Sequence, residues 1–178
     1  AAVIRAILRF EPVTVIAAPG NRDEVVNACG ASVEVFEIPI DDCWIRDNGP
    51  IFVVDGAGGV AMTDFGFNAW GGLNEEWAND DALPERLAEL LGMRRYCAPI
   101  ISEGGGITCD GEGTVITTES VLLNPNRNPG LTKADIELVL RDYLGAEKVI
   151  WLPYGLAEDM GEFGTGGHSD NVVQFTRP

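Results

Sequence analysis

The sequence is poor in basic residues and in histidine, and it has no long apolar run. It holds 12 lysine and arginine residues against 28 aspartate and glutamate residues, a formal charge of −16, and a single histidine among 178 residues. This charge repels nucleic-acid phosphates and anionic membranes and attracts small cations. No stretch approaches the roughly 18–20 apolar residues of a membrane span. We therefore expect no membrane and no nucleic-acid partner. Taken by itself, the charge indicates solubility rather than a cationic ligand.

The cysteine pattern argues against a zinc site and against a disulfide framework. The four cysteines form no C-x-x-C pair, and one histidine is too few for the common zinc clusters. Residues 1–10 carry two arginines and no small-residue cleavage pattern, so they do not indicate a secretory signal. We expect free thiols in a reducing cytoplasm, and neither a metal nor a cofactor.

Both ends of the sequence are abrupt. There is no initiator methionine, and a predicted strand at Val13–Ala17 comes almost at once. A further strand, predicted at Asn171–Thr176, stops as the sequence stops. We therefore expect residues 1–178 to be a single truncated domain.

One order of elements recurs almost three times along the chain: helix, strand, polar loop and hairpin. The apolar periodicity and the glycine stops predict helices at Asp23–Cys29, Asp81–Leu91 and Lys133–Leu144, strands at Ser32–Ile38, Arg94–Ile101 and Lys148–Leu152, and hairpins over Pro50–Phe65 and Ile107–Thr118. Leu83, Leu87, Leu90 and Leu91 would share one face of the second helix. A repeat of tens of residues indicates a radial or stacked α/β architecture.

The polar loops of the three units hold three acids and the only histidine. These residues are Asp47, Glu103, His168 and Asp170. In a radial arrangement equivalent loops point to a common centre, so we predict that the four side chains line one pocket. If residues 168–170 are extended, His168 and Asp170 face the same side.

Three carboxylates around an imidazole suit a planar guanidinium ion. Its N–H groups pair with carboxylates in a fork geometry, and two acids can hold both of its edges. An imidazole transfers protons near neutral pH, and a neighbouring carboxylate favours its charged, acidic form. The predicted pocket is therefore suited to chemistry on a guanidine.

Seven segments, in order along the chain, resemble the family of agmatine deiminase and bacterial peptidyl-arginine deiminase, within the guanidine-modifying enzymes. They are Trp44–Pro50, Glu103–Gly105, Thr117–Glu119, Leu122–Asn124, Asn126–Pro129, Ile150–Leu152 and Gly167–Asn171. The resemblance implies a pentein fold, a five-bladed α/β propeller of ββαβ units. About three blades would be present, because family members are roughly twice this length, and the C-terminal blades would be missing.

The resemblance also implies the roles of the pocket residues. Asp47 and Asp170 would bind the guanidinium, Glu103 would orient His168, and His168 would be the general acid and base. The family's nucleophile is a cysteine thiolate that forms a covalent thiouronium. It lies in a glycine-rich turn near the family's C-terminus, which this sequence does not reach, so the chain alone is expected to be inactive.

The expected reaction is hydrolysis of agmatine to N-carbamoylputrescine and ammonia, a step of putrescine and polyamine biosynthesis. Peptidyl arginine or another guanidine is the alternative substrate. The segment 158–166 bears on that choice, because it is longer than the acidic stretch usual in the family and carries Phe163. A different alternative is a non-catalytic, cation-binding fragment. Homo-oligomerisation is also expected, because an incomplete ring exposes apolar faces.

Several further residues near these motifs have competing interpretations. Trp70 is a candidate substrate-binding residue, whereas Trp44 is assigned to the core; a tryptophan face can hold a cation or an alkyl chain. Arg127 is assigned to a structural turn. Cys43 is disfavoured as a nucleophile because no base adjoins it in sequence. Asp41 and Asp42 are disfavoured as metal ligands because their spacing is not that of an EF-hand.

Overall fold

The structure is a computed structural model that describes residues 1–177. The chain forms two compact units, Ala1–Asp41 and a second that begins at Asp42. Within the described residues, no helix has the length and apolar character needed to cross a membrane.

The first unit pairs two short parallel strands with two helices. Its elements are α1 (Ala2–Ile7), β1 (Thr14–Ala17), α2 (Arg22–Cys29) and β2 (Glu34–Glu37). Strand β1 pairs with β2 so that Val15 lies opposite Val35, and Ala17, Cys29, Val33 and Val35 form the buried core. The sequence pattern predicts all of these elements except α1, which has no buried residue and no side-chain cap.

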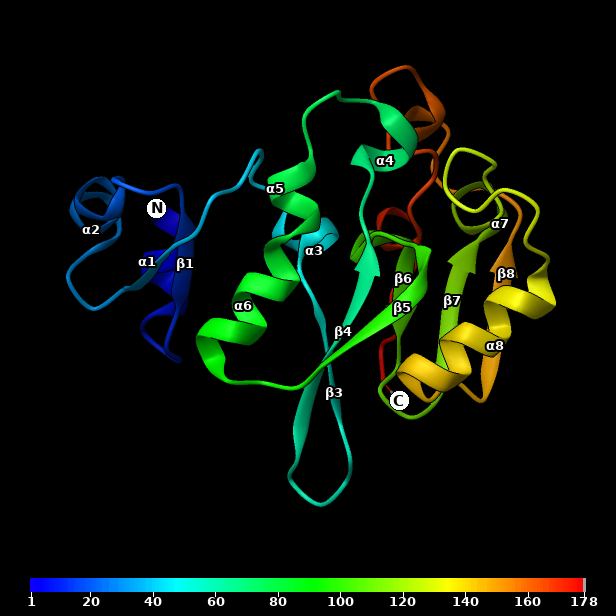
Figure 1. The fold of residues 1–178 in the computed structure, drawn as a ribbon, viewed down its shortest axis with the longest axis horizontal. Coiled ribbons are helices and arrows are strands. Elements are labelled where there is room, and N and C mark those ends of the chain that lie inside the picture. Colours follow the sequence, from blue (N-terminus) through cyan, green and yellow to red (C-terminus); the bar gives the residue numbers. More distant parts are fainter. Residues whose placement is uncertain (178) are drawn as a thin grey trace. The chain divides into compact units, whose positions relative to one another are not determined.

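The second unit contains two sheets of identical topology. The first comprises β3 (Ile51–Val54), β4 (Val60–Gly66) and β5 (Arg95–Ile101); the second comprises β6 (Ile107–Cys109), β7 (Thr114–Thr118) and β8 (Lys148–Leu152). In each, an antiparallel hairpin is followed by a helix and then by a strand parallel to the second hairpin strand. The predicted recurrence of helix, strand and hairpin is confirmed (Figure 1).

Matching local signals build the two repeats. The carboxylate of Asp55 accepts hydrogen bonds from the backbone of Ala57 and Gly59 in the first hairpin turn. Asp110 makes the same pattern in the second hairpin, with Glu112 and Thr114. Such an Asx turn satisfies the reversing backbone locally.

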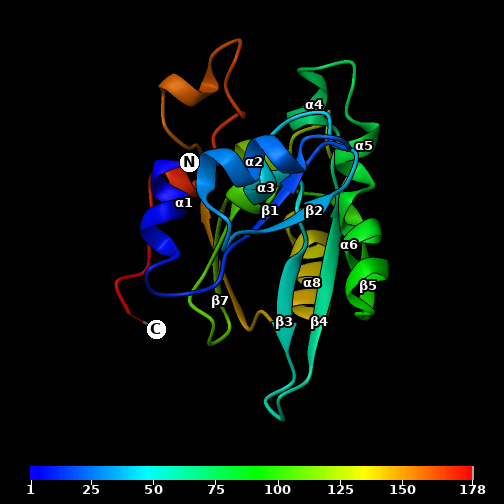
Figure 2. The same cartoon turned by 90° about the vertical axis from the view of Figure 1, so that its left-hand side faces the viewer.

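Helix α8 (Lys133–Leu144) has the bounds that the sequence predicts, because both of its ends are encoded. Thr132 and Asp135 form a reciprocal capping box, and Gly145 ends the helix with a φ of 70°. Ile136 and Leu140 are fully buried. The hydroxyl of Thr63 in β4 donates to the backbone oxygen of Tyr143, so α8 contacts the first sheet (Figure 2).

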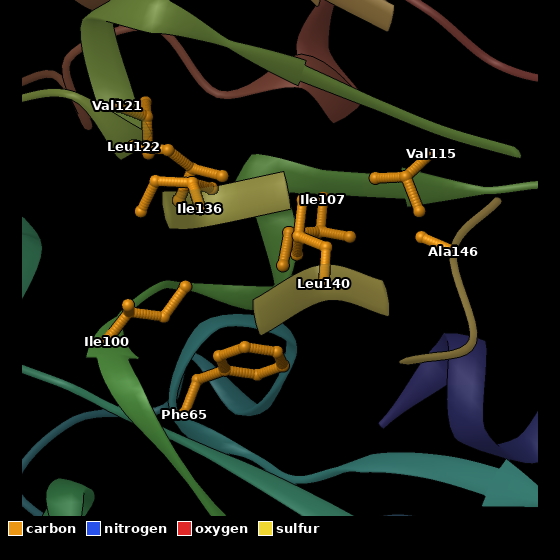
Figure 3. Packing of buried hydrophobic residues seen from close by; sticks show 9 residues of the cluster. All are labelled: Phe65, Ile100, Ile107, Val115, Val121, Leu122, Ile136, Leu140 and Ala146. Carbon is orange, nitrogen blue, oxygen red and sulfur yellow. The ribbon is translucent and has the colours of Figure 1, made fainter. Parts of the chain in front are cut away.

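The core of the second unit joins α8 to both sheets. It comprises Phe65, Ile100, Ile107, Val115, Val121, Leu122, Ile136, Leu140 and Ala146 (Figure 3). Strand β5 contributes Ile100 to the core, and Val149 and Trp151 of β8 pack against it. The core therefore holds in place the polar loops that follow β5 and β8.

The second predicted helix is confirmed as α6 (Leu83–Leu91), which begins two residues later than predicted and has Pro84 in its first turn. Proline is tolerated there because the first backbone N–H groups of a helix have no partner within it. A separate short helix, α5 (Ala78–Asp81), precedes α6. Leu83 and Leu87 are buried, but Leu90 and Leu91 are exposed at 55% and 44%, so the leucine face of α6 is covered only in its N-terminal part.

The predicted strand at Asn171–Thr176 was also wrong. The 3-10 turn η3 (Ser169–Asn171) stands at its start, and within residues 171–177 the structure has no strand. A strand needs a neighbour for its backbone hydrogen bonds, and none of the described strands pairs with this segment. Further short elements are α3 (Ile45–Asn48), α4 (Ala69–Gly72), α7 (Glu119–Leu122), η1 (Gly104–Gly106) and η2 (Glu158–Met160).

Candidate active site

Three short helical turns carry the predicted pocket residues. Asp47 lies within α3, Glu103 immediately precedes η1, and His168 immediately precedes η3. These turns are not part of the two sheets and lie where the chain leaves a strand or crosses between repeats. The backbone at such turns makes no strand-to-strand hydrogen bonds, so its side chains need not alternate between the two faces of a sheet and can point toward a common site.

The imidazole of His168 lies between two buried carboxylates. Its Nδ1 is 3.7 Å from Asp47 Oδ1, and its Nε2 is 3.5 Å from Glu103 Oε2. Both distances exceed a normal N–H···O hydrogen bond. The side chains of His168, Asp47 and Glu103 are 3%, 9% and 0% exposed. The structure therefore brings together three of the four predicted residues in a setting shielded from water.

Asp170, the fourth residue, joins the group above Gly105. A methyl group built on Gly105 would stand 3.0 Å from Asp170 Oδ2 and 2.6 Å from Asp47 Oδ1, and closer still to His168 Nδ1. The backbone N–H of Gly105 also donates to Asp47 Oδ1 at 3.0 Å. The three side chains thus converge over a position that only glycine can occupy. Asp170 itself is exposed, unlike the other three.

Glu103 is held by a buried arginine. Arg127 Nε donates to both carboxylate oxygens at 2.9 and 3.0 Å, and the side chains are 1% and 0% exposed. Burial raises the pKa of Glu103, but the charges and contacts of His168 and Arg127 outweigh it and hold that pKa below its usual value. Arg127 lies in the predicted turn, but its contact with Glu103 was not predicted.

Asp47 has weaker compensation. Its Oδ2 accepts a hydrogen bond from the indole of Trp70 at 3.0 Å. Burial raises the pKa of Asp47, and His168, Trp70 and Gly105 oppose this only in part, so the pKa stays above its usual value. The described residues therefore do not fully offset the cost of burying the negative charge of Asp47. A bound cation would supply the positive charge that offsets the rest.

Trp70 adopts a left-handed backbone conformation, with a φ of 56°. This conformation is costly for a bulky residue and marks a constrained position. The ring packs edge-on against Phe67 at 5.1 Å and against Trp44 at 6.3 Å. Assigning Trp44 to the core was wrong: it is 53% exposed, because it precedes α3 at a cavity wall rather than beneath a sheet or helix.

A cavity of about 600 Å³ opens over these residues. Its lining combines aromatic and acidic side chains: Trp44, Trp70, Phe163, Asp42, Asp47, Glu162 and Asp170, together with His168. Phe163, in the long segment before His168, is 92% exposed. Arg46 is the single basic residue in the lining. The size and lining suit a small organic cation with an apolar stem.

None of the four cysteines lines this cavity. Cys29 is buried in the first unit, and Cys43, Cys97 and Cys109 are exposed with free thiols. Although Cys109 is exposed, surrounding atoms partly desolvate its thiol, and this desolvation and the neighbouring Asp110 raise its pKa, which disfavours the thiolate. Within residues 1–177 there is also no group of three or more histidine, cysteine or acidic side chains arranged to hold a metal ion.

Together these features define an α/β protein with a histidine–carboxylate site suited to a cation. The family model described as Porphyromonas-type peptidyl-arginine deiminase matches residues 1–178, so the chain belongs to that family. The resemblance inferred from the seven segments is thereby confirmed.

Relatives of known name agree with this assignment. The agmatine deiminase of Pseudomonas aeruginosa strain LESB58 is 48% identical over 100% of this chain and 49% of its own length. That of Pseudomonas putida is 47% identical over 98% of this chain and 48% of its own. The chain thus spans about half the length of the curated relatives it matches.

Solved structures give the same picture. The agmatine deiminase of Enterococcus faecalis superposes with a TM-score of 0.92 at 37% identity, over 99% of this chain and 49% of that one. A cysteine-to-serine variant of the C. jejuni agmatine deiminase, with substrate bound, superposes with a TM-score of 0.87 at 31% identity, over 99% and 51%.

Proposed function

We propose that this chain forms the guanidinium-binding part of a deiminase that hydrolyses agmatine to N-carbamoylputrescine and ammonia. The observation that carries the proposal is the grouping of His168 with Asp47, Glu103 and Asp170 around Gly105. A guanidinium ion offers flat N–H edges to two carboxylates at once. Of the three acids in this group, Asp47 and Asp170 line the cavity, and Glu103 does not.

In this proposal Asp47 and Asp170 hold the substrate, and Glu103 with Arg127 orients the imidazole. Asp47 gains most from a bound cation, because its burial is incompletely compensated in the chain itself. Trp70 orients Asp47 through its indole N–H and lines the same cavity, where it can contact the methylene chain of the ligand.

The chemistry then needs a thiolate that attacks the guanidinium carbon. The tetrahedral adduct expels ammonia after His168 donates a proton to the leaving nitrogen. A thiouronium remains, and water that has lost a proton to His168 attacks the same carbon. Departure of the thiolate, with loss of the remaining hydroxyl proton to the released ammonia or to solvent, gives the urea product. The single imidazole between the acids thus gives one proton to the leaving nitrogen and regains one from the attacking water.

We propose that the thiolate comes from residues outside this sequence. None of the four cysteines is among the residues that line the cavity, and the raised pKa of Cys109 disfavours its reactive form. On this account the chain binds the cation without turning it over. In the alternative, a non-catalytic binding module, the chain binds the same cation, but no thiolate completes the site.

Agmatine is favoured over arginine and peptidyl arginine by the charge around the cavity. Agmatine carries an amine at the far end of its chain, whereas arginine carries a carboxylate there. Glu162 and Asp42 add negative charge to the lining, and Phe163 and Trp44 offer apolar faces to a methylene chain. The proposal places the complete protein in cytoplasmic polyamine synthesis, with a pentein propeller completed by further ββαβ units or by a second copy of the chain.

Calorimetric titration of the purified chain with agmatine tests the proposal. We expect a saturable one-site event, weaker binding of arginine, and no release of ammonia. Asp47→Asn should abolish the heat of binding, whereas Asp142→Asn, at an exposed surface pair with Arg141, should leave it unchanged. Absence of binding by the folded chain would contradict the proposal, and ammonia release by the chain alone would contradict the external thiolate.

A further inference from the structure

Asp159 ties together the loop that carries the histidine, which we define as the histidine loop, residues 158–168. Its Oδ1 accepts from the backbone N–H of Thr165 at 2.8 Å. Its Oδ2 accepts from the hydroxyl of Thr165 at 2.5 Å and from the backbone N–H groups of Gly167 and His168 at 3.1 and 2.9 Å. One carboxylate therefore binds both the start of the Thr165–His168 segment and the backbone of the histidine itself.

A second set of contacts holds the same loop from outside. Arg127 Nη2 donates to the backbone oxygen of Thr165 at 2.6 Å, while its Nε holds Glu103. The hydroxyl of Thr118 donates to the backbone oxygen of Gly167 at 2.8 Å. Arg127 thus links the histidine loop to Glu103, the acid that lies beside Nε2 of His168.

Glu103 and Asp47 act on the imidazole through their charge and not through hydrogen bonds of normal length. Its buried Nε2 makes no hydrogen bond with the described residues, and its nearest acidic oxygens lie 3.5 and 3.7 Å away. A ring without close polar partners takes its position from its backbone and its packing. The backbone at His168 is the part that Asp159 binds.

We propose that Asp159 is a positioning residue, which fixes the main chain at Gly167 and His168 so that the imidazole stays between Asp47 and Glu103. The inference rests on the proposed function, because it assigns the support of the proton-transferring group in that site. Asp159 acts through His168 and is not itself placed at the reacting atoms.

The donor pattern requires a carboxylate rather than an amide. All of the contacts to Asp159 come from N–H or O–H donors, and both of its oxygens are used. Asparagine offers one acceptor and one NH₂ group, so one side would bring two donors face to face. Asp159→Asn is nearly isosteric, and it therefore disrupts the anchor without creating a cavity.

The single histidine makes a direct test possible. In the ¹⁵N-labelled 19.1 kDa chain the imidazole resonances can come from His168 alone, because the sequence has no other histidine. Asp159→Asn is expected to shift and broaden these resonances and to weaken agmatine binding roughly tenfold, the size found when partners that orient metal-binding histidines are removed. Thr165→Val, which loses one donor to Asp159, should give a smaller change of the same kind.

Matched variants separate positioning from stability. Thr165→Ser keeps the hydroxyl and should change the resonances less than Thr165→Val, and Asp142→Asn should match the wild type. A merely stabilising Asp159 would lower the melting temperature and leave the imidazole resonances of the folded protein unchanged, and that result would overturn the inference. If Asp159→Asn does not fold, Thr165→Val carries the same test. The resonances are read without ligand, so a failure to bind agmatine would count against the proposed function alone.

Discussion

The two acids that flank His168 differ in one respect. Glu103 and Asp47 are both buried and lie at similar distances from the imidazole. Glu103 has Arg127 as a buried partner and its pKa is lowered, whereas Asp47 has only neutral donors besides His168 and its pKa is raised. The difference shows how one site can compensate the charge of one carboxylate internally and leave the other in need of a cation.

The largest effect is expected when Glu103 loses its partner. Arg127→Met should destabilise the fold by about 3–5 kcal/mol, because it leaves a buried carboxylate without compensation. Urea unfolding measures the loss. Arg141→Met, at an exposed ion pair, is the control and should cost under about 1 kcal/mol. Equal effects of the two substitutions would contradict the contrast between Glu103 and Asp47.

A smaller loss of stability is expected at Gly105, over which Asp47, His168 and Asp170 converge. Gly105→Ala would drive a methyl group into Asp47 and His168, which should cost about 1–3 kcal/mol as over-packing and should abolish agmatine binding. Gly161→Ala is the control, because a Cβ there meets only Glu158 O at 3.4 Å. Normal agmatine affinity in Gly105→Ala would show that the convergence over Gly105 is not part of the site.

Asp47→Asn should change stability by no more than about 1 kcal/mol at pH 7, because the lost hydrogen bond is offset by relief of a buried charge. Urea unfolding at pH 7 checks this value. The same substitution should abolish agmatine binding, so stability and binding separate at Asp47. A loss as large as that of Arg127→Met would mean that Asp47 is a structural acid.

The smallest effect is the pH dependence. A lowered pKa in Glu103 stabilises the fold above the pKa of the unfolded chain, and this contribution is lost as the pH falls through the folded value. The raised pKa of Asp47 acts oppositely, because the folded state takes up a proton more readily and gains stability on acidification. Asp47→Asn should therefore lose more stability than the wild type between pH 6 and pH 4, by under about 1.4 kcal/mol per unit of pKa shift. Parallel urea-unfolding profiles would contradict the raised pKa.

The sequence was sufficient for elements whose signals are local. The capping box at Thr132 and the glycine stop at Gly145 fix α8, and strands between turn residues fix the hairpins. The grouping of Asp47, Glu103, His168 and Asp170 followed from the repeat and from the family motifs. Such patterns carry their own periodicity or spacing, and this is why they can be read before any coordinates.

The remaining features depend on contacts that leave no local pattern. Arg127 and Glu103 form an ion pair although they are 24 residues apart in the sequence, and no local pattern near either residue predicts this contact. The exposure of Trp44 depends on which surfaces remain uncovered. The turns η1 and η3 are too short to show a period. The crowding over Gly105 could have been suspected from the run of three glycines after Glu103, because close approach of groups to a backbone favours glycine.

The central claim is that a guanidinium binds beside the imidazole of His168, between acids that are compensated differently. The most direct measurement is the ¹⁵N spectrum of the single histidine during titration with agmatine. The account predicts a saturable shift of the His168 resonances in the wild type and none in Asp47→Asn. Unchanged resonances in the folded wild-type chain at saturating agmatine would contradict it.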